Sequence, residues 1–354
     1  MTRPTVCYYV SGHGLGHASR AAQVMAKLDA RIRILVKSAA PAEFFRQAAG
    51  RPLEVIADRF DIGVVQPDNR TLDWQQTFCD AALLWEQKYA ALQDEVKFLQ
   101  QQGACAVISD VPPMPLLAAR RAGIPAVLVA NFTWLDIYKS AAHTYPDGLA
   151  LLRHYADAYA CADITLRPGL AFGMRYQSPQ LDVGLIARRG QRIRKQLEAK
   201  LGVSSRGKMV LLYFGNLGDQ DLRLRDMAGG PNVTFVSFTP LPGIAHELDP
   251  DEWHFPDVVA SVDAVLAKPG YGTVGECMAN GTPVIYYPRP EFAEYRVLRK
   301  GLQDWGGAVQ ISTRDFITGN WSRALESAWK LKPDRVPAPG ASRVVSEIEK
   351  LLKY

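Results

Sequence analysis

Short apolar runs with little charge alternate with longer amphipathic stretches along the first half of the chain. Apolar runs of about four to eight residues that are bounded by turn residues are typical of buried parallel strands. Apolar residues at helical spacing follow the first run, at Ala21, Val24 and Leu28. The pattern also predicts a polar loop over residues 58–73 and a long helix over residues 74–102. The apolar runs cover residues 5–10, 32–37, 53–57, 104–109 and 126–130. Together these features predict an α/β fold built from βαβ units.

The same alternation starts again in the second half, with apolar runs at residues 210–214, 233–238 and 264–267. Between the halves, residues 168–184 hold several glycines and prolines and lead toward a helix ending near Leu201, which indicates a connection between domains. A chain of 354 residues is also too long for one core. We therefore expect two Rossmann-like doubly wound domains, residues 1–182 and 183–354, that face each other across a ligand cleft. The last helix is expected to pack back on the first domain.

Composition and charge indicate an ordinary globular protein. Hydrophobic residues make up 48% and charged residues 22% of the chain, which leaves ample material for a core. The formal charge of +5 is spread along the sequence and does not indicate a nucleic-acid partner. Five cysteines without a CxxC pair predict core thiols in a reducing compartment. No apolar stretch reaches the roughly 20 residues of a bilayer span, so we expect a cytoplasmic protein with at most peripheral membrane contact.

One strand of the second half ends in a turn that is typical of anion sites. The run at 264–267 continues into Lys268-Pro-Gly-Tyr-Gly-Thr273, and Glu276 follows three residues later. A glycine turn brings the backbone close to a phosphate, and the N–H groups and dipole of the next helix favour its charge. We expect Thr273 to be the N-cap of that helix. Glu276 then either binds a ribose diol or completes a capping box with Thr273, and the local sequence leaves both open.

The first strand leads into a glycine loop that carries two histidines, Gly12-His-Gly-Leu-Gly-His17. The loop is not the dinucleotide fingerprint, because its glycine spacing differs and Lys37 stands where an acidic residue is expected. A histidine at the carboxyl end of a parallel strand lies where open α/β sheets bind ligands, and it can act as a base. His13 and His17 are therefore candidate bases. For each of them, capping or packing in the loop is the structural alternative.

Polar and aromatic residues follow two later strands at the same expected edge of the sheet. Asp110 ends the run at 104–109, and two prolines after it stop the strand and open the next helix. Asn131-Phe-Thr-Trp134 follows the next run. Because the carboxyl ends of parallel strands share one edge, Asp110 is expected to face His17. The aromatic residues either line an acceptor pocket or belong to the core, and both interpretations stay open.

Taken together, these segments resemble a known group of enzymes. Two such domains, with a histidine-bearing glycine loop in the first and G-x-G-T-x-x-E in the second, resemble the GT-B glycosyltransferases, especially the N-acetylglucosaminyltransferase of peptidoglycan synthesis. The glycosyltransferase-like half of L-arabinokinase-type proteins is more similar still. That likeness covers most of the chain and rests on four motifs in family order, Gly12-His-Gly-Leu-Gly-His17, Ser109-Asp-Val-Pro-Pro113, Asn131-Phe-Thr-Trp134 and Lys268-Pro-Gly-Tyr-Gly-Thr273. The resemblance covers the glycosyltransferase-like half and not the kinase half with its own phosphate loop, so sugar phosphorylation is not expected of these residues.

The resemblance implies an inverting, metal-independent transfer of a sugar from a nucleoside-diphosphate donor, such as a UDP-sugar, to an unidentified acceptor. The N-terminal domain would bind the acceptor and the C-terminal domain the donor. His17 would be the general base, with His13 as the second candidate and Asp110 as a possible orienting partner. The positions implied for the donor are Gly14, Gly16, Gly215, Asn216, Phe238, Leu241, Gly270, Gly272, Thr273, Glu276 and Glu294.

Within that set, the helix start at Gly272 and Thr273 would hold the diphosphate, and Gly215 and Asn216 would contact a phosphate from the other side. The base would lie against residues 238–241. Glu294 occupies the region that contacts the donor sugar in the family. The family often has an acid-amide or paired-amide motif there, whereas this chain reads Pro-Glu-Phe-Ala-Glu-Tyr over residues 290–295. The identity of the sugar is therefore left open.

Two other functions remain open at this point. Gly14 to Arg20 reads G-x-G-H-x-x-R in outline, which resembles the nucleotide-sugar hydrolase of pseudaminic acid biosynthesis, where water would be the acceptor. A non-catalytic nucleotide-sugar-binding module is the third interpretation. Neither a metal ion nor a cofactor is expected, because Asp219-Gln-Asp221, although of DxD form, is better explained as a helix-start cap beside a glycine loop.

Overall fold

The structure is a computed structural model that describes residues 3–67, 71–176, 179–214 and 232–352. The chain divides into two compact units. Unit 1 comprises Met1–Ile186 together with Pro339–Tyr354, and unit 2 comprises Ala187–Ala338. The division thus follows Ile186, a few residues beyond the expected boundary after residue 182, and the last residues of the chain return to unit 1.

Unit 1 is built on a seven-stranded parallel sheet with the order β3-β2-β1-β4-β5-β6-β7. The strands are β1 (Thr5–Val10), β2 (Arg33–Ser38), β3 (Glu54–Ala57), β4 (Ala104–Asp110), β5 (Ala126–Val129), β6 (Ile164–Pro168) and β7 (Gln180–Gly184). β1 is buried along its whole length, as its uncharged run predicts. The order reverses between β1 and β4, and this switch point is where open α/β sheets bind their ligands.

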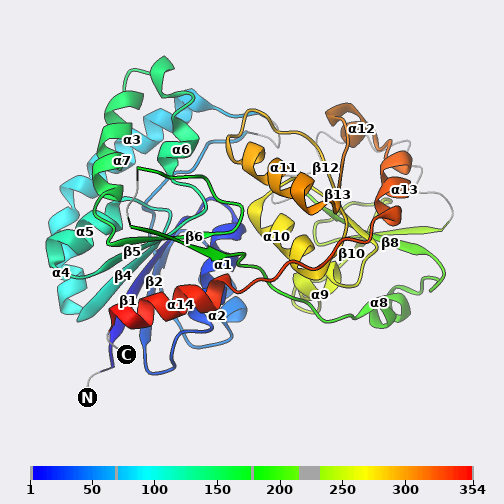
Figure 1. Cartoon of the computed structure of the whole chain (residues 1–354), viewed down its shortest axis with the longest axis horizontal. Helices are drawn as coiled ribbons and strands as arrows, with labels where there is room; N and C mark the ends of the chain where they lie inside the picture. The colour runs from blue at the N-terminus through cyan, green and yellow to red at the C-terminus, as the bar shows by residue number, and fades with distance from the viewer. Residues whose placement is uncertain (1–2, 68–70, 177–178, 215–231, 353–354) are drawn as a thin grey trace. The chain divides into compact units, whose positions relative to one another are not determined.

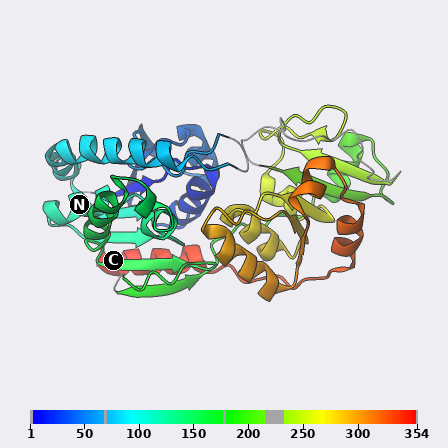
Figure 2. The same cartoon turned by 90° about the horizontal axis from the view of Figure 1, so that it is seen from above.

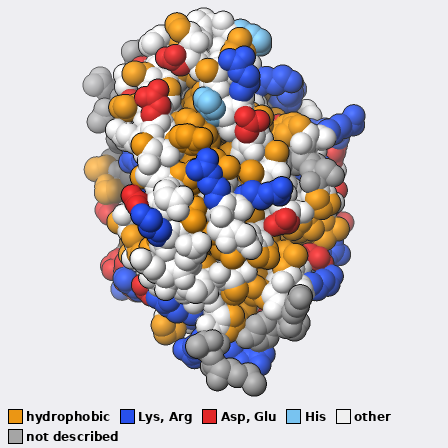
Figure 3. All heavy atoms as spheres, turned by 90° about the vertical axis from the view of Figure 1, so that its left-hand side faces the viewer, with side chains coloured by type: hydrophobic (Ala, Val, Ile, Leu, Met, Phe, Trp, Pro, Cys, Tyr) orange, Lys and Arg blue, Asp and Glu red, His pale blue; other side chains and the backbone are white. Residues whose placement is uncertain are grey.

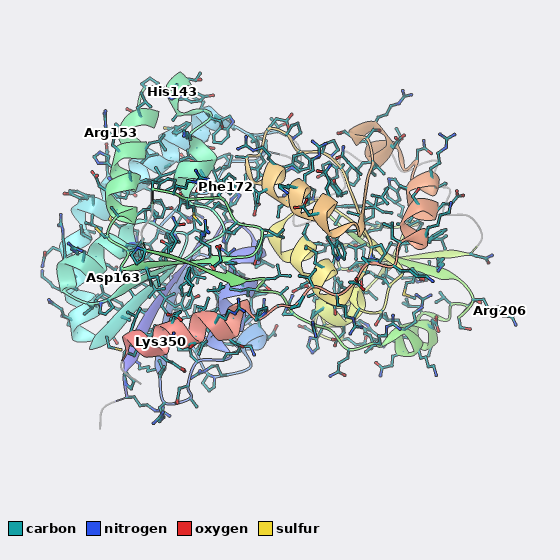
Figure 4. All side chains as sticks on the ribbon, in the orientation of Figure 1. His143, Arg153, Asp163, Phe172, Arg206 and Lys350 are labelled. Atoms are coloured by element: carbon teal, nitrogen blue, oxygen red, sulfur yellow. The ribbon has the colours of Figure 1, made fainter. Side chains whose placement is uncertain are left out.

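Helices cover both faces of this sheet (Figures 1 and 2). The helices of unit 1 are α1 (Leu15–Met25), α2 (Ala42–Ala49), α3 (Trp74–Ala90), α4 (Leu92–Gln101), α5 (Met114–Ala122), α6 (Trp134–Tyr138), the 3₁₀ turn η1 (Ala142–Thr144), α7 (Gly148–Tyr159) and α14 (Gly340–Leu351). α1, α2 and α14 share one apolar core with the sheet. α14 comes from the end of the chain and packs on α1 and β7, with Lys350 projecting from it (Figure 4).

Unit 2 repeats the same topology with a six-stranded parallel sheet of the order β10-β9-β8-β11-β12-β13. Its strands are β8 (Lys208–Tyr213), β9 (Val233–Ser237), β10 (His246–Glu247), β11 (Ala264–Ala267), β12 (Val284–Tyr286) and β13 (Ala308–Gln310). Its helices are α8 (Arg194–Leu201), α9 (Phe255–Val259), α10 (Tyr271–Asn280), α11 (Glu294–Trp305), α12 (Thr313–Thr318) and α13 (Ser322–Lys330). The switch point of this sheet lies between β8 and β11. The predicted class, two doubly wound α/β units, is confirmed.

The structure differs from the predicted elements at three places in unit 1. The helix after β1 begins at Leu15, inside the expected loop, because Gly14 turns the chain with a φ of 80°. His17 therefore lies in the first turn of α1. The helix predicted over residues 74–102 is broken at Ala91 into α3 and α4. Strand β7 was not predicted, because it pairs with one neighbour only and is largely exposed.

The five cysteines are free thiols. Cys7 and Cys277 are buried as predicted, but the prediction of a core thiol is wrong for Cys79, which is exposed on α3. Acidic and basic side chains lie interspersed with apolar ones on the face of the molecule shown in Figure 3. Within the described ranges, no helix combines the length and the apolar character that a bilayer span requires.

Candidate active site

His17 and Asp110 meet at the switch point of unit 1. In the paired strands β1 and β4, Val10 lies opposite Asp110, so the first turn of α1 stands beside the end of β4. His17 Nδ1 is 2.9 Å from Asp110 Oδ1, and both side chains are buried. Arg20 Nη2 also lies 3.1 Å from His17 Nδ1, but it donates to Asp110 Oδ1 at the shorter distance of 2.6 Å. Because an ionised carboxylate only accepts, the contact with Asp110 places the proton on Nδ1 and leaves the lone pair on Nε2. This is the arrangement of an oriented general base.

Arg20 holds the same carboxylate from one helical turn further along α1. Its Nε lies 2.9 Å from Asp110 Oδ2 and its Nη2 lies 2.6 Å from Oδ1. Its Nη1 donates to Asn131 Oδ1 at 2.6 Å. Burial alone would raise the pKa of Asp110, but the charge of Arg20 and the hydrogen bonds from Arg20 and His17 outweigh it, so the pKa lies below its ordinary value. Asp110 is therefore ionised.

The chain leaves Asp110 through a strained residue. Val111 has a φ of 83° and is fully buried, a conformation that is unfavourable for a β-branched side chain. The Tyr159 hydroxyl donates to the Val111 carbonyl at 2.8 Å and accepts from the Trp134 N–H at 3.1 Å. Tyr159, on α7, thus joins the segments that follow β4 and β5 and holds the backbone that carries Asp110.

His13 is fixed by three contacts in the loop before α1. Its ring stands edge-on to Trp134, with centroids 5.6 Å apart. It also packs on Gly63, where an added Cβ would overlap the imidazole. Its Nε2 lies 3.2 Å from Gln66 Nε2. Because that nitrogen already has a polar partner, His13 is less well arranged as a base than His17.

The two interpretations of the Asn131–Trp134 segment are resolved in favour of the core. Phe132 and Trp134 are buried, so the acceptor-pocket interpretation is wrong for both side chains. Phe132 stands edge-on to His17 with a centroid separation of 5.6 Å, and Trp134 contacts His13 in the same way. Each of the two aromatic rings therefore packs against one of the histidines and restricts its orientation.

Asp61 is a buried carboxylate that sequence reasoning missed. It lies in the segment between β3 and α3, which was interpreted as a polar loop, although Phe60, Asp61 and Val64 are all buried there. Ser11 Oγ donates to Asp61 Oδ1 at 3.1 Å, and Trp134 Nε1 donates to Oδ2 at 2.8 Å. The signal in the sequence was an aspartate flanked by apolar residues inside the loop.

In unit 2, the turn after β11 leads into α10 as expected, but the N-cap differs. α10 begins at Tyr271 and its N-cap is Gly270, with no side-chain cap. The Val274 N–H donates to the Gly270 carbonyl at 2.9 Å and closes the first turn. The prediction that Thr273 is the N-cap is therefore wrong, because Gly270 already takes the extended conformation that a cap needs. Thr273 instead lies within the first turn.

Glu276 belongs to the second turn of α10, too far along the helix to complete a capping box. That alternative is excluded. Arg188 Nε donates to Glu276 Oε1 at 2.5 Å, and Asn280 holds the Arg188 carbonyl with its amide. The other carboxylate oxygen, Oε2, is buried and has no hydrogen-bond partner among the described residues. Burial raises the pKa of Glu276, and the charge and hydrogen bond of Arg188 oppose that rise.

Lys268 is a second residue whose role sequence reasoning missed. It directly follows β11, and its backbone N–H donates to the Tyr213 carbonyl at the end of β8. Its partly buried Nζ has no hydrogen-bond or ion-pair partner in the described part of the chain. Burial and then the charge of Arg289 lower the pKa of Lys268 to about 8, while Glu294 acts in the opposite direction. A cation therefore stands beside the uncapped start of α10.

The remaining donor positions lie in several different parts of the chain. Phe238 is partly exposed and packs on Phe255, whereas the Leu241 side chain is buried in the core of unit 2. Glu294 is buried at the start of α11. Gly14 is the N-cap of α1, with Gly16 exposed in its first turn. Gly215, Asn216 and the Asp219–Asp221 segment lie outside the described residues. Within the described ranges, no three His, Cys, Asp or Glu side chains are grouped so that they could hold a metal ion.

Comparisons with known proteins relate the chain to glycosyltransferases. No protein-family model matches the chain. Over 351 residues the chain is 31% identical to the L-arabinokinase of Arabidopsis thaliana, a match that covers 92% of this chain and 32% of that protein. The chain thus spans about a third of that relative's length. It is also 23% identical over 286 residues to an uncharacterized glycosyltransferase of Methanopyrus kandleri, covering 73% of this chain and 80% of that protein.

Solved glycosyltransferase structures resemble the whole chain. The calicheamicin glycosyltransferase CalG4 superposes with a TM-score of 0.65 at 17% identity, covering 99% of both chains. MurG of Acinetobacter baumannii superposes with a TM-score of 0.56 at 15% identity, covering 98% of this chain and 99% of MurG. Together with the two switch-point sheets, these likenesses show that the chain has the GT-B fold, the fold of these glycosyltransferases.

Proposed function

We propose that the chain is a glycosyltransferase that moves a sugar from a nucleoside-diphosphate donor to a hydroxyl or amine acceptor, with inversion and without a metal ion. The observation that carries this proposal is the buried pair of His17 and Asp110 at the switch point of unit 1. An oriented imidazole with a lone pair on Nε2 is what removal of a proton from an acceptor requires. The GT-B fold supports the reaction class by analogy.

In the proposed reaction, a lone pair of the acceptor oxygen or nitrogen attacks the anomeric carbon of the donor. The acceptor's proton passes to Nε2 of His17. The bond between the anomeric carbon and the diphosphate oxygen breaks, and the nucleoside diphosphate leaves with that electron pair. An in-line displacement of this kind inverts the anomeric carbon. Asp110 accepts from Nδ1–H throughout and keeps the imidazolium oriented.

Unit 2 would hold the donor through α10 and its neighbours. The first N–H groups of α10 have no acceptor within the helix, and the N-cap residue, Gly270, has no side chain that could cap them. These N–H groups and Lys268 would bind the diphosphate, because both offer positive charge at one place. Glu276 Oε2, buried and without a partner among the described residues, would accept a hydrogen bond from a ribose hydroxyl. Glu294 is proposed to contact the donor sugar.

The proposal includes no metal ion, since Lys268 and the start of α10 would stabilise the departing diphosphate. We expect turnover to be unchanged, within about twofold, when a chelator is added. The measurement is release of nucleoside diphosphate before and after EDTA, and then after Mg²⁺ or Mn²⁺ is restored. Activity that disappears with the chelator and returns with the cation would contradict this part of the proposal.

A panel of nucleotide sugars tests the proposed function. The protein is incubated with each donor, with and without a cell extract that supplies acceptors, and free nucleoside diphosphate is measured. Release that requires the extract is the expected result. A heat-treated sample of the same protein controls for contaminating hydrolases in the extract. Binding of a donor without release under either condition would leave a non-catalytic module as the better description.

Hydrolysis of the same donor is the second candidate. It is favoured by Arg20, which completes the G-x-G-H-x-x-R pattern and clamps Asp110 in the structure. Water would then take the place of the acceptor beside His17. The panel separates the two candidates, because release at an equal rate without the extract supports hydrolysis.

A further inference from the structure

The negative charge of Asp110 is already compensated before any proton transfer. Both of its oxygens accept from the Arg20 guanidinium, and Arg20 is itself almost fully buried. In a His–carboxylate pair without such a cation, the carboxylate also balances the imidazolium that forms during the reaction. Here the positive charge of Arg20 already offsets the negative charge of Asp110, so Asp110 stabilises an imidazolium on His17 less. His17 also lies in the first turn of α1, where the helix dipole adds positive potential.

A second buried carboxylate in the same unit has no such cation. Asp61 is held by the Ser11 hydroxyl and the Trp134 indole N–H, which are both neutral donors. No Lys or Arg of the described chain forms an ion pair with Asp61. Burial raises the pKa of Asp61, while its two hydrogen bonds and the charge of His17 oppose the rise. Because both of its oxygens accept hydrogen bonds, as those of an ionised carboxylate do, Asp61 contributes a negative charge that no Lys or Arg of the described residues pairs.

Two separate series of contacts connect Asp61 with His17. Trp134 donates to Asp61 and packs edge-on against Phe132, with centroids 5.3 Å apart. Phe132 in turn packs edge-on against His17. On the other side, the Ser11 hydroxyl donates to Asp61 and the Ser11 N–H donates to the Asp110 carbonyl. Ser11, Phe132 and Trp134 are all buried, so bulk water screens the charges of Asp61 and His17 only weakly.

We propose that Asp61 supplies the counter-charge for the imidazolium that forms on His17, an inference that rests on the proposed role of His17 as the base. The cluster of His17, Arg20, Asp110 and Asp61 has a net negative charge while His17 is neutral. It becomes neutral when His17 takes up the acceptor's proton. Asp61 does not touch the substrate. It acts through His17, because its negative charge stabilises the protonated imidazole.

The tyrosines around the cluster remain uncharged at neutral pH, and the other titratable group there is His13, whose ring stands edge-on to Trp134. Tyr138 on α6, with Tyr155 and Tyr159 on α7, faces Asp61, and burial raises the pKa of each of these hydroxyls. Tyr8 on β1 faces Asp110 and Arg20, and burial raises its pKa as well. The charge balance around His17 is therefore set by Arg20, the two aspartates and the protonation of His13.

The titration of His17 in an Asp61→Asn variant tests the inference without any substrate. Asparagine preserves the volume and can still accept from Trp134 and donate to Ser11, while the charge is lost. We expect the imidazole NMR resonances of His17 to titrate at a lower pH than in the wild type, because a nearby negative charge that favours the imidazolium is lost. Asp58→Asn is the matched control, because Asp58 lies in the same segment but pairs with Lys88. An unchanged His17 titration in Asp61→Asn would overturn the inference.

The reciprocal variant keeps the inference testable if Asp61→Asn does not fold. Because coupling between two sites is mutual, His17→Gln should raise the pH at which the Asp61 carboxyl resonance titrates by a similar amount. An unmoved Asp61 titration in this variant also overturns the inference. With a donor and an acceptor that the protein turns over, the low-pH side of the kcat/KM profile should shift in the same direction as the His17 titration. The KM for the donor should stay constant. The substrate-free titrations separate a failure of this inference from a failure of the proposed function.

Discussion

At the scale of single residues, Glu276 connects an observed gap in hydrogen bonding to a predicted ligand. Oε1 is paired with Arg188, whereas Oε2 is buried without a partner among the described residues. We expect Glu276→Gln to weaken binding of the nucleoside diphosphate by about 1.5 to 3 kcal/mol, roughly ten- to a hundredfold in Kd, because a charged acceptor of the ribose is lost. Isothermal titration calorimetry on the purified variant measures this change.

The control is Glu198→Gln on α8, where Glu198 pairs with Arg194 Nε at 2.6 Å in a similar Arg–Glu contact. This change should leave the affinity unaltered. Thermal melting of both variants reports any loss of stability. If Glu276→Gln binds the nucleoside diphosphate as tightly as the wild type, the ribose contact is wrong and the ion pair with Arg188 is structural.

Lys268 predicts a pH dependence for donor binding. Burial and Arg289 lower its pKa to about 8, so the free protein loses this cation as the pH rises through about 8. A bound diphosphate favours the charged form, so affinity should be full below about pH 7 and should fall as the pH rises above 8. Calorimetric titration between pH 6.5 and roughly 9.5 tests this. In Lys268→Arg, which stays charged, the affinity should be nearly constant over that range, and an equal pH dependence in both proteins would contradict the assignment.

At the scale of elements, Tyr159 ties α7 to the strained backbone after β4. Its hydroxyl bridges the Val111 carbonyl and the Trp134 N–H. Tyr159→Phe leaves both buried groups unpaired, so we expect the free energy of unfolding to fall by about 1 to 3 kcal/mol in urea denaturation. Tyr155→Phe on the same helix is the matched control, because the Tyr155 hydroxyl forms no hydrogen bond within the described chain. Equal stability losses in the two variants would argue against the bridge.

Much of the element pattern could be predicted, and the failures have physical reasons. Buried strands such as β1 and β4 were predicted from uncharged runs, and their parallel pairing brought Asp110 to His17 as expected. The start of α10 was misplaced because Gly270 caps the helix through its backbone conformation, which side-chain preferences do not indicate. Asp61 was missed because its burial depends on Trp134, which is distant in the sequence. Local patterns report the strands well but not which loops close over them.

At the scale of the whole molecule, the repetition of one topology was predicted from two similar series of apolar runs. Each unit places its candidate residues at its own switch point, His17 and Asp110 in unit 1 and Lys268 with α10 in unit 2. The resemblance of four short motifs to the GT-B glycosyltransferases agrees with the fold. The sugar and the acceptor could not be predicted, because they depend on side chains such as Glu294 whose identity departs from the family pattern.

The central claim is that His17 of unit 1 acts as the base on a nucleotide sugar that unit 2 binds. The most direct measurement is release of nucleoside diphosphate by His17→Gln, with donor affinity measured on the same protein. We predict that turnover falls by about two to four orders of magnitude, while donor affinity stays within about twofold of the wild type. The control is His143→Gln, since His143 is exposed on η1 (Figure 4), and it should keep full turnover. Near-normal turnover in His17→Gln would contradict the account.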